Sequence, residues 1–350
     1  MENPDLKSLP DQPVPEGAAV AMIRTSDGVT LRSAWFPPST NLLPGARARG
    51  TVCVFPGRTE FIEKYYEVIE DLRKRGFAVA MLDWRGQGLS ARNPKKPFHG
   101  HVRNFDHYQR DLGAFLDQVV LPSCPKPYYA LAHSMGGHIL FVASAGGSAR
   151  HFERMVLTAP MLHLAPLMLA GWHRLRYSRG MIASRIISQR LTRWATLIGR
   201  LIGRGGSFAP GSGKATVHEF ANNLLSSDAV RFQRFNAFLA AYPELGLGGP
   251  TNAWVHSACV SMRRSLRPDK LQKLAVPTLI IASGADEIVS TPAIEKLTPD
   301  LRLLHHIVIR NARHEVMFER DELRNQFWAA FDAFIPGSEH PGSRSASEPA

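Results

Sequence analysis

The sequence predicts an α/β protein whose mostly parallel central sheet has helices on both faces and a helical insertion at one edge. The first observation is a set of short, almost wholly apolar runs, such as "TVCVF" at residues 51–55 and "TLIIAS" at residues 278–283. Runs of this kind are typical of parallel strands that are buried on both faces. The second observation is that helical patterns separate these runs, as in other α/β proteins. The third is a basic segment, about residues 161–265, that contains no clear strand-like run.

The predicted elements follow one another along the chain without an internal repeat. "VAMIRT" and "VTLRSAWF", separated by "SDG", indicate a hairpin. "EFIEKYYEVIEDLRKRG" has the periodicity of a helix that ends at Gly76, and "NFDHYQRDLGAFLDQVV" that of a helix capped by Asn104 or Asp106. The other expected strands are "TVCVF", "FAVAML", "YYALA", "RMVLTAP", "TLIIAS" and "HHIVI", and "SMGGHILFVASA" is expected to be a helix.

These elements divide the chain into a core and an insertion. We expect residues 18–160 and 266–335 to form the core and residues 161–265 to form a helical cap. The cap would lie over the carboxyl ends of the strands, where open α/β sheets bind their ligands. Residues 1–17 and 336–350 are rich in Pro, Ser and Glu, so we expect both segments to be flexible tails.

The composition indicates a globular protein of a reducing compartment. The chain has 350 residues, of which 44% are hydrophobic, enough for a sizeable core. Its three cysteines, Cys53, Cys124 and Cys259, form neither a disulfide framework nor a metal-ligand pattern. The first residues lack the pattern of a signal peptide, and no apolar run approaches the roughly 20 residues that cross a bilayer. We therefore expect a cytoplasmic protein.

Basic residues are concentrated in the predicted cap. The net charge is +12, and no acidic residue occurs between Glu153 and Glu219. A basic, apolar-rich segment suits an anionic lipid substrate or peripheral contact with an anionic membrane surface, here the inner one. An equally weighted explanation of the basic residues is that they lie on a helix face exposed to solvent. Nucleic-acid binding is not expected, because the chain has no zinc finger, RNA-binding aromatic signature or lysine-rich tail. The basic residues of this window are Arg174, Arg176, Arg179, Arg185, Arg190, Arg193, Arg200, Arg204 and Lys214.

The candidate nucleophile is Ser134 in "LAHSMGG", residues 131–137. A serine at a sharp strand-to-helix turn projects its hydroxyl above the sheet, and the residues around it have to be small. Gly136 meets this requirement after the serine, and Ala132 stands where glycine is usual before it. Capping of the helix is the ordinary alternative role for a serine at this position.

A nucleophilic serine needs a base and a carboxylate that orients the base. Asp286, in the loop after "TLIIAS", is the candidate acid, and its neighbour Glu287 is the alternative. His314, in a polar loop between the strand "HHIVI" and the closing helix, is the candidate base. Each of the three follows a strand, so all three are expected at the carboxyl edge of the sheet. The weaker candidates for the base are His305, His306 and His340.

Two backbone N–H groups are expected to hold the oxyanion, one from Met135 and one from Arg58 in the loop after "TVCVF". His133 and Trp254 are candidates for substrate contact, although Trp254 suits the cap core equally well. No cofactor is expected, because "RGQGLSA" at residues 85–91 resembles a dinucleotide fingerprint but is followed by "RNPKKPF", which cannot begin a helix. No metal is expected either, since "HEVMF" lacks a second histidine.

Several blocks of the sequence, taken together, resemble one branch of a known family. They are "VFPGRTEFIEKY", "DWRGQGLSAR", "GHVRNFDHY", "LAHSMGGHI", "LTAPM", "GGPTNAWV" and "RHEVMFERD". This combination resembles the lysophospholipase L2 branch of the monoacylglycerol lipase-like α/β hydrolases, from about residue 20 to residue 334. The resemblance implies an α/β-hydrolase fold and a cofactor-free serine esterase that releases a fatty acid from a glycerol-based lipid. It assigns the nucleophile to Ser134, the acid to Asp286 and the base to His314.

We therefore expect a serine ester hydrolase that forms an acyl-enzyme from a single-chain, amphiphilic glycerolipid. The arginine-rich cap favours a lysophospholipid over a neutral monoacylglycerol, because arginine pairs with phosphate. The alternatives with related chemistry are a monoacylglycerol lipase, a carboxylesterase for small esters, and a peptidase that cleaves near a chain terminus. The alternative from a different class is a catalytically idle protein that binds membrane surfaces.

Overall fold

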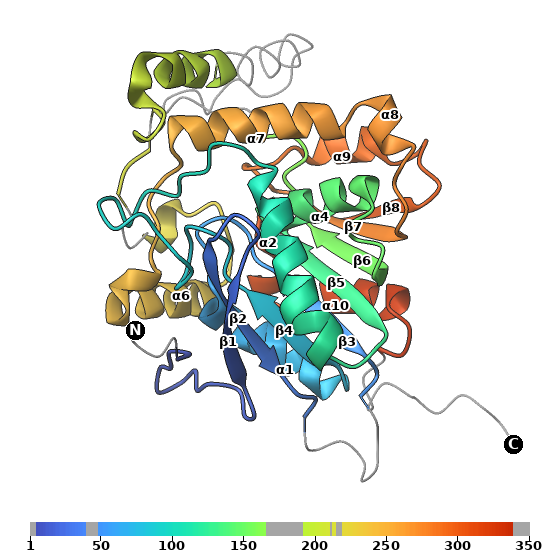
Figure 1. Cartoon of the computed structure of the whole chain (residues 1–350). Helices are drawn as coiled ribbons and strands as arrows, with labels where there is room; N and C mark the ends of the chain where they lie inside the picture. The colour runs from blue at the N-terminus through green and yellow to red at the C-terminus, as the bar shows by residue number, and fades with distance from the viewer. Residues whose placement is uncertain (1–4, 40–47, 166–191, 211, 215–218, 339–350) are drawn as a thin grey trace, which may run out of the picture.

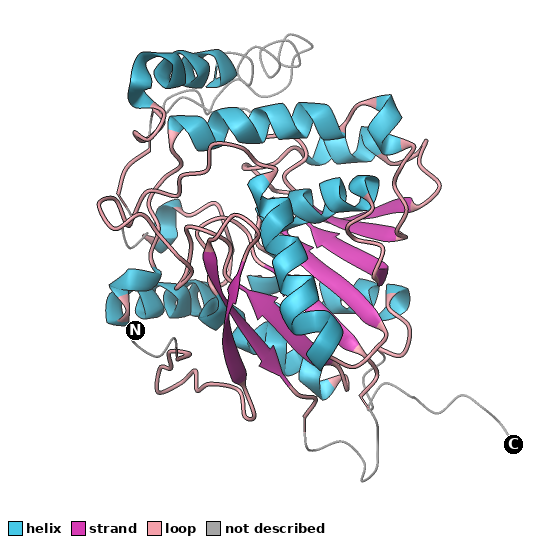
Figure 2. Ribbon diagram, viewed as in Figure 1, coloured by secondary structure: helices cyan, strands magenta, loops and turns pink. Residues whose placement is uncertain are grey.

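The computed structural model describes residues 5–39, 48–165, 192–210, 212–214 and 219–338. An eight-stranded sheet runs through this part of the chain in the order β1-β2-β4-β3-β5-β6-β7-β8 (Figure 2). The β1–β2 and β2–β4 pairs are antiparallel, and all other neighbours are parallel. The predicted α/β fold with a mostly parallel sheet is therefore confirmed. The strands are β1 (Ala19–Arg24), β2 (Thr30–Phe36), β3 (Thr51–Phe55), β4 (Ala78–Leu82), β5 (Tyr128–His133), β6 (Phe152–Thr158), β7 (Thr278–Ser283) and β8 (Leu304–Ile309).

Side chains of the central strands alternate between two apolar clusters, one on each face of the sheet. In β3, Cys53 and Phe55 belong to one cluster, whereas Val52 and Val54 belong to the other. All four side chains are fully buried, as the unbroken apolar run predicts for a parallel strand. The helices that cover the first face are α2 (His107–Phe115) and α4 (Ser134–Gly146), and those that cover the second are α1 (Tyr66–Lys74) and α10 (Asp321–Phe334) (Figure 1).

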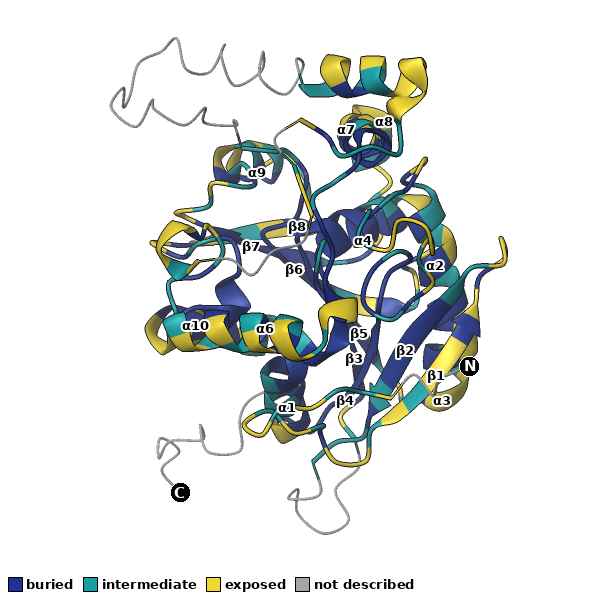
Figure 3. Ribbon diagram, turned by 90° about the vertical axis from the view of Figure 1, so that its left-hand side faces the viewer, coloured by how far each residue is buried: buried dark blue, intermediate teal, exposed yellow. Residues whose placement is uncertain are grey.

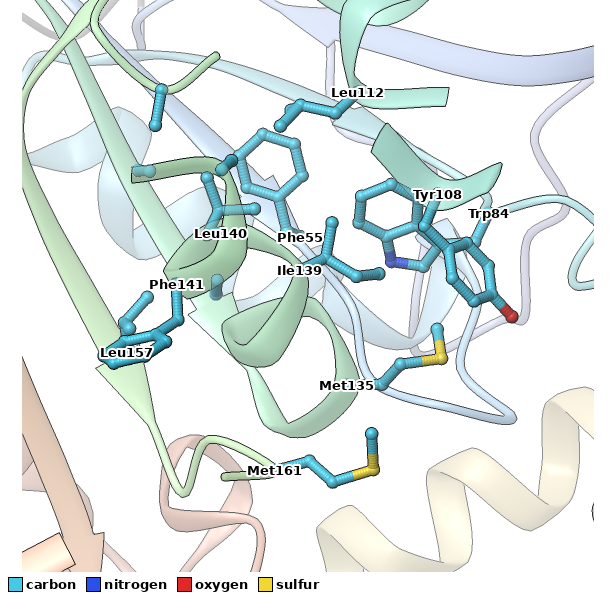
Figure 4. Close-up of a cluster of buried hydrophobic side chains, with 14 of the residues drawn as sticks. Phe55, Trp84, Tyr108, Leu112, Met135, Ile139, Leu140, Phe141, Leu157 and Met161 are labelled. Atoms are coloured by element: carbon cyan, nitrogen blue, oxygen red, sulfur yellow. The ribbon is translucent and has the colours of Figure 1, made fainter. Parts of the chain in front are cut away.

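The first cluster packs directly against the helix that begins at Ser134. Figure 4 shows Ile139 and Leu140 of α4 beside Phe55. The rings of Phe55 and Trp84 stack with centroids 5.8 Å apart, and Tyr108 meets Trp84 edge-on at 5.7 Å. Aromatic pairs in these geometries add stability beyond the apolar area that they bury. The packing fixes the start of α4 relative to the ends of β3 and β5.

Helix ends follow the sequence signals in most places. α1 ends at Lys74, and Gly76 then adopts φ +86°, a left-handed conformation that glycine takes at little cost. The helix expected from residue 104 is divided, because a π-helical turn (Leu116–Val120) and the short α3 (Leu121–Ser123) follow α2. Within the ranges described above, no helix combines the length and apolarity needed to cross a membrane.

The chain between β6 and β7 contains helices above the carboxyl edge of the sheet. α7 (Asn252–Ser265) packs along α4 (Figure 1). Residues 192–199 are helical, and apart from the buried Thr196 they are half-buried or exposed (Figure 3). Arg174, Arg176, Arg179, Arg185 and Arg190 lie outside the described residues, and the boundaries of the cap at residues 161 and 265 stay a prediction. The other α-helices are α6 (Ala229–Ala241), α8 (Pro268–Leu271) and, after β7, α9 (Thr291–Leu297).

Residues 5–17 lie against the core, which differs from the flexible tail expected for residues 1–17. The backbone N–H of Lys7 donates a hydrogen bond to the buried Glu63 carboxylate at 3.1 Å. Leu6, Leu9 and Val14 pack on the second apolar cluster. The local composition indicates a flexible segment, but it contains no information on the packing partners that distant parts of the chain supply. Of the expected C-terminal tail, residues 339–350 lie outside the described residues.

Candidate active site

Ser134 occupies the turn between β5, which ends at His133, and α4. Its φ of +48° lies in the left-handed region, which residues other than glycine rarely adopt. A Cβ at Gly136 would lie 2.5 Å from the carbonyl oxygen of Phe55, so the close approach of α4 to β3 excludes a side chain there. The local structure is the strand, sharp turn and helix that a nucleophilic serine requires.

His314 lies between Ser134 and Asp286. Its Nε2 is 2.9 Å from Ser134 Oγ, and its Nδ1 is 2.7 Å from Asp286 Oδ2. Asp286 follows β7 and His314 follows β8, so the three side chains come from the carboxyl ends of three parallel strands. The structure therefore brings together the serine, aspartate and histidine that the sequence analysis selected.

The contacts of Asp286 favour its ionised form although its side chain is completely buried. Burial by itself raises the pKa of this carboxyl, but His314 and the backbone N–H groups of Ile288 and Val289 outweigh burial, so that the pKa is lowered. An ionised Asp286 accepts the hydrogen bond from Nδ1 of His314. The lone pair of Nε2 is then directed at the Ser134 hydroxyl, as proton transfer requires.

None of the alternative acid and bases that the structure describes forms a hydrogen bond with the Ser134 hydroxyl, which is paired with His314. Glu287, next to Asp286, is exposed. His305 and His306 are on the edge strand β8, where the His306 ring contacts Thr298 Oγ1. His340 lies outside the described residues.

In the loop after β3, the backbone N–H groups on either side of Arg58 are engaged. The N–H of Gly57 donates to the Glu60 carboxylate, and the N–H of Thr59 donates to Gln87 Oε1 at 3.2 Å. No described residue accepts a hydrogen bond from the N–H of Arg58, which lies between them. Met135 is in the first turn of α4, where backbone N–H groups have no partner within the helix. An oxyanion hole formed by Arg58 and Met135 fits these observations and stays a prediction.

Comparison with known proteins identifies the family. A family model described as serine aminopeptidase, S33, matches residues 46–321. The chain belongs to this family. Lysophospholipase L2 of Escherichia coli (strain K12) is 32% identical to the chain over 304 residues, which cover 84% of this chain and 83% of that protein. Probable lysophospholipase L2 of Haemophilus influenzae is 28% identical over 293 residues, which cover 83% and 85% respectively. The resemblance seen in the sequence blocks is therefore confirmed.

Solved structures support the same fold for this S33-family chain. A soluble variant of monoglyceride lipase from Saccharomyces cerevisiae, in complex with a substrate analogue, superposes with a TM-score of 0.68. The match covers 93% of this chain and 98% of that protein at 19% identity. A likeness at this level of identity shows the fold alone, and it agrees with the α/β-hydrolase architecture expected from the sequence.

A buried charge network, which the sequence analysis did not predict, supports the site of this S33-family chain. Lys64 Nζ lies 2.7 Å from Glu60 Oε1 and 2.6 Å from Glu315 Oε1, and all three side chains are more than nine-tenths buried. Burial by itself raises the pKa of Glu60, but Lys64 outweighs it and the pKa is lowered to about 2. Glu60, Glu315 and His133 also form a candidate metal-binding group among the described residues. Lys64 already supplies the cation between the two carboxylates, so the salt bridges to Lys64 explain why these side chains lie close together.

Side chains also hold the loop that contains Arg58. Gln87 Nε2 donates to the carbonyl oxygen of Gly57 at 3.0 Å, and Trp84 Nε1 donates to that of Pro56 at 2.9 Å. Thr59 has φ +68°, a conformation that costs free energy for a β-branched residue and persists only where surrounding contacts impose it. The direction of the Arg58 N–H is therefore set by contacts on both sides of the loop.

The two residues proposed for substrate contact are largely buried. His133 is 1% exposed, its Nδ1 is 3.1 Å from Thr158 Oγ1, and its ring centroid is 4.8 Å from that of His314. Burial lowers the pKa of His133 to about 3, so the ring is neutral beside the base. These contacts suit a positioning role better than substrate contact. Trp254 is 7% exposed, and its Nε1 donates to the Tyr108 hydroxyl at 3.1 Å.

Proposed function

We propose that the protein is a serine esterase that hydrolyses the acyl ester of a single-chain glycerolipid, in particular a lysophospholipid. The observation that supports this most directly is the hydrogen-bonded chain Ser134–His314–Asp286. A hydroxyl, an imidazole and a carboxylate in this order form the machinery of acyl transfer. The similarity to two lysophospholipases L2 along most of their length supports the substrate class.

The reaction would proceed in two halves through an acyl-enzyme. His314 Nε2 removes the proton of Ser134 as Oγ attacks the ester carbonyl, and ionised Asp286 stabilises the imidazolium that forms. The imidazolium then protonates the departing glycerol oxygen, and the acyl group stays on Oγ. Water enters, loses a proton to the same nitrogen and attacks the acyl carbonyl. The fatty acid leaves and Ser134 recovers its proton.

The negative charge of each tetrahedral intermediate would rest on the backbone N–H groups of Arg58 and Met135. Removing one such donor typically costs on the order of 100-fold or more in rate. The N–H groups of Gly57 and Thr59 are engaged, whereas no described residue accepts a hydrogen bond from the Arg58 N–H between them. The donors are therefore organised before the charge develops.

The surface of the cap suits an amphiphile taken up from a membrane. Residues 192–204 expose large apolar side chains next to Arg200 and Arg204, which are also exposed. Apolar side chains interleaved with cations favour peripheral contact with an anionic lipid surface. The exposed apolar side chains are Trp194, Ile198, Leu201 and Ile202.

An aminopeptidase is the second candidate, because the matching family model is described as serine aminopeptidase. Such an enzyme has to bind the free ammonium group of its substrate, for which a carboxylate is the natural partner. Next to the site, Glu60 and Glu315 both hold Lys64, and Asp286 holds His314. These engaged carboxylates favour an ester over a peptide with a free amino terminus.

Labelling with a fluorophosphonate followed by substrate profiling tests the proposal. The wild-type protein should become covalently modified at Ser134, the Ser134→Ala variant should not, and lysophosphatidylglycerol should release fatty acid. Faster release of p-nitroaniline from alanyl p-nitroanilide than of p-nitrophenol from p-nitrophenyl octanoate would favour the aminopeptidase. Absence of labelling in a correctly folded protein would support an idle, membrane-binding role instead.

A further inference from the structure

The side chain of Arg58 lies between the core and the cap and has no carboxylate partner among the residues that the structure describes. Its Nη2 donates to the carbonyl oxygen of Gly248 at 2.7 Å, and its guanidinium carbon lies 5.2 Å from the centroid of the Trp254 ring. The buried Nε has no hydrogen-bond partner in the described part of the chain. Burial lowers the pKa of Arg58 to about 10, so the group stays protonated at neutral pH. A cation is therefore held next to the predicted oxyanion donor, and one of its buried N–H groups, that of Nε, is left unpaired among the described residues.

The buried arginines that the structure describes have carboxylates to offset their charge. Arg32 pairs with Glu63 and Asp83, as does Arg85 with aspartates. Arg58 is half-buried, with its Nε out of contact with solvent, and a cation in such a place without a carboxylate partner costs free energy, which an anionic ligand would recover. Arg92 also lacks a carboxylate partner in the described ranges, but it donates to three carbonyl oxygens and so holds a loop together.

The position of Arg58 relates this cation to the reacting ester. The backbone N–H of the same residue is the predicted oxyanion donor, so the start of the side chain lies beside the substrate carbonyl. Two molecular lengths can be compared by counting covalent bonds. The count from the Cα of arginine to its guanidinium carbon equals the count from the acyl ester oxygen of a 1-acylglycerol 3-phosphate to its phosphorus. A substrate bound with its carbonyl at the Arg58 N–H can therefore extend its phosphate to the Arg58 guanidinium.

We propose that the guanidinium of Arg58 binds the phosphate of the substrate head group and so determines the preference for phosphate-bearing over neutral glycerolipids. The inference rests on the proposed esterase function and adds the residue that distinguishes the substrates. Guanidinium binds phosphate through charge-assisted hydrogen bonds, often two at once. Gly248 and Trp254 position the group for this contact. Gly100 leaves room for it, because a Cβ at that position would lie 2.8 Å from Arg58 Nη2.

The first test compares hydrolysis of two lipids with the same acyl chain, 1-decanoyl-glycerol 3-phosphate and 1-decanoylglycerol, below their critical micelle concentrations. In Arg58→Met, the ratio of kcat/KM for the phosphate-bearing to the neutral lipid should fall roughly 10- to 100-fold, the effect of losing charge-assisted hydrogen bonds. The backbone N–H is retained in this variant. Arg92→Met is the matched control, because it removes a buried arginine of the neighbouring loop, and its ratio should remain that of the wild type.

The second test measures binding without turnover. Ether analogues, 1-O-decylglycerol 3-phosphate and 1-O-decylglycerol, are titrated into Ser134→Ala and into Ser134→Ala/Arg58→Met by calorimetry. Only the phosphate analogue should lose affinity on replacement of Arg58. An unchanged hydrolysis ratio and an unchanged phosphate affinity would overturn the role of Arg58 while leaving the esterase function intact, as would an equal change of ratio in Arg92→Met. Arg58-dependent phosphate binding in a protein that cleaves no ester would support the phosphate contact and overturn the esterase.

Discussion

The ammonium group of Lys64 lies 2.6 Å from the carboxylate of Glu315, a residue 251 positions further along the chain. Because Lys64 also contacts Glu60, this one cation links the loop of the predicted oxyanion donor to the loop of His314. Two elements of the site that have to keep a fixed distance are therefore joined by buried charges. Such a network is costly to interrupt, since each charge lies where water cannot replace a lost partner.

Replacement of Lys64 by methionine should destabilise the protein and impair turnover. Two buried carboxylates would lose their shared cation, and removing one partner of a buried ion pair typically costs about 3–5 kcal/mol. Denaturant unfolding measures the free energy, and kcat/KM for a p-nitrophenyl ester measures turnover. Lys296→Met, at an exposed position of α9, is the control and should change the free energy of unfolding by less than about 0.5 kcal/mol. Equal stability of the two variants would contradict the assigned role of the network.

Substitution of Gly136 by alanine should lower kcat. The added Cβ would lie 2.5 Å from the Phe55 carbonyl oxygen and 2.7 Å from that of Pro56, so α4 and the loop of Arg58 have to move apart. A displacement of either oxyanion donor should reduce the rate by about 10-fold or more. Gly146→Ala in the same helix is the control, because no described atom other than those of its chain neighbours and its own helix backbone lies within 4 Å of the added Cβ. A variant at residue 136 with wild-type kcat would show that the close contact does not position the donors.

The Asp286→Asn variant should retain its fold and lose activity. An amide at this position can donate a hydrogen bond to Nδ1 of His314, which favours the tautomer with its proton on Nε2 and removes the acceptor for the Ser134 proton. A loss of about 10⁴-fold in kcat is expected for the wrong tautomer. Steady-state hydrolysis of a p-nitrophenyl ester measures it, and circular dichroism checks the fold. Glu287→Gln should have wild-type activity, and a comparable loss in that variant would reassign the acid.

The free energy of unfolding should fall as the pH decreases below about 6.5. Burial lowers the pKa of His138 to about 3, so the folded state keeps this ring neutral while the unfolded chain takes up a proton. A group whose pKa is depressed on folding stabilises the protein above its unfolded pKa, and this contribution is lost as the pH falls towards the folded value. His138 alone should account for about 2 kcal/mol between pH 6.5 and pH 5.

Unfolding by urea across this pH range measures the effect. His138→Gln should be less stable than the wild type at pH 8, because the hydrogen bond to Ser261 Oγ and the packing on Phe105 change. Its stability should nevertheless vary less with pH. His305→Gln, on the exposed part of β8, should follow the wild-type profile. Identical pH dependence in all three proteins would exclude His138 as the source.

The sequence was sufficient to predict the sheet and the positions of Ser134, Asp286 and His314. Apolar runs reveal strands buried on both faces, and polar residues at their carboxyl ends have to meet at one edge of a parallel sheet. The family resemblance supported the same assignment. These inferences depend on local pattern and on topology, and both can be recovered from one chain.

The supporting contacts could not be predicted in the same way. Lys64 lies in a helical pattern where a charged residue is ordinary, and only the approach of Glu315 from a distant loop makes it a buried link. Residues 5–17 pack on the core through partners supplied by residues far along the chain. The one sequence signal was proximity, because Glu315 directly follows the candidate base and Glu60 lies two residues after Arg58.

The hydrogen bond from Arg58 to Gly248 gives a single residue two mechanical attachments. Its main chain offers the N–H expected to stabilise the transition state, and its side chain is hydrogen-bonded to the segment that leads into α7. An outward movement of residues 246–251 would be transmitted through that side chain to the predicted oxyanion donor. Entry of a bulky lipid and stabilisation of the transition state would then be coupled. The enzyme would be most active once residues 246–251 have moved back against the core.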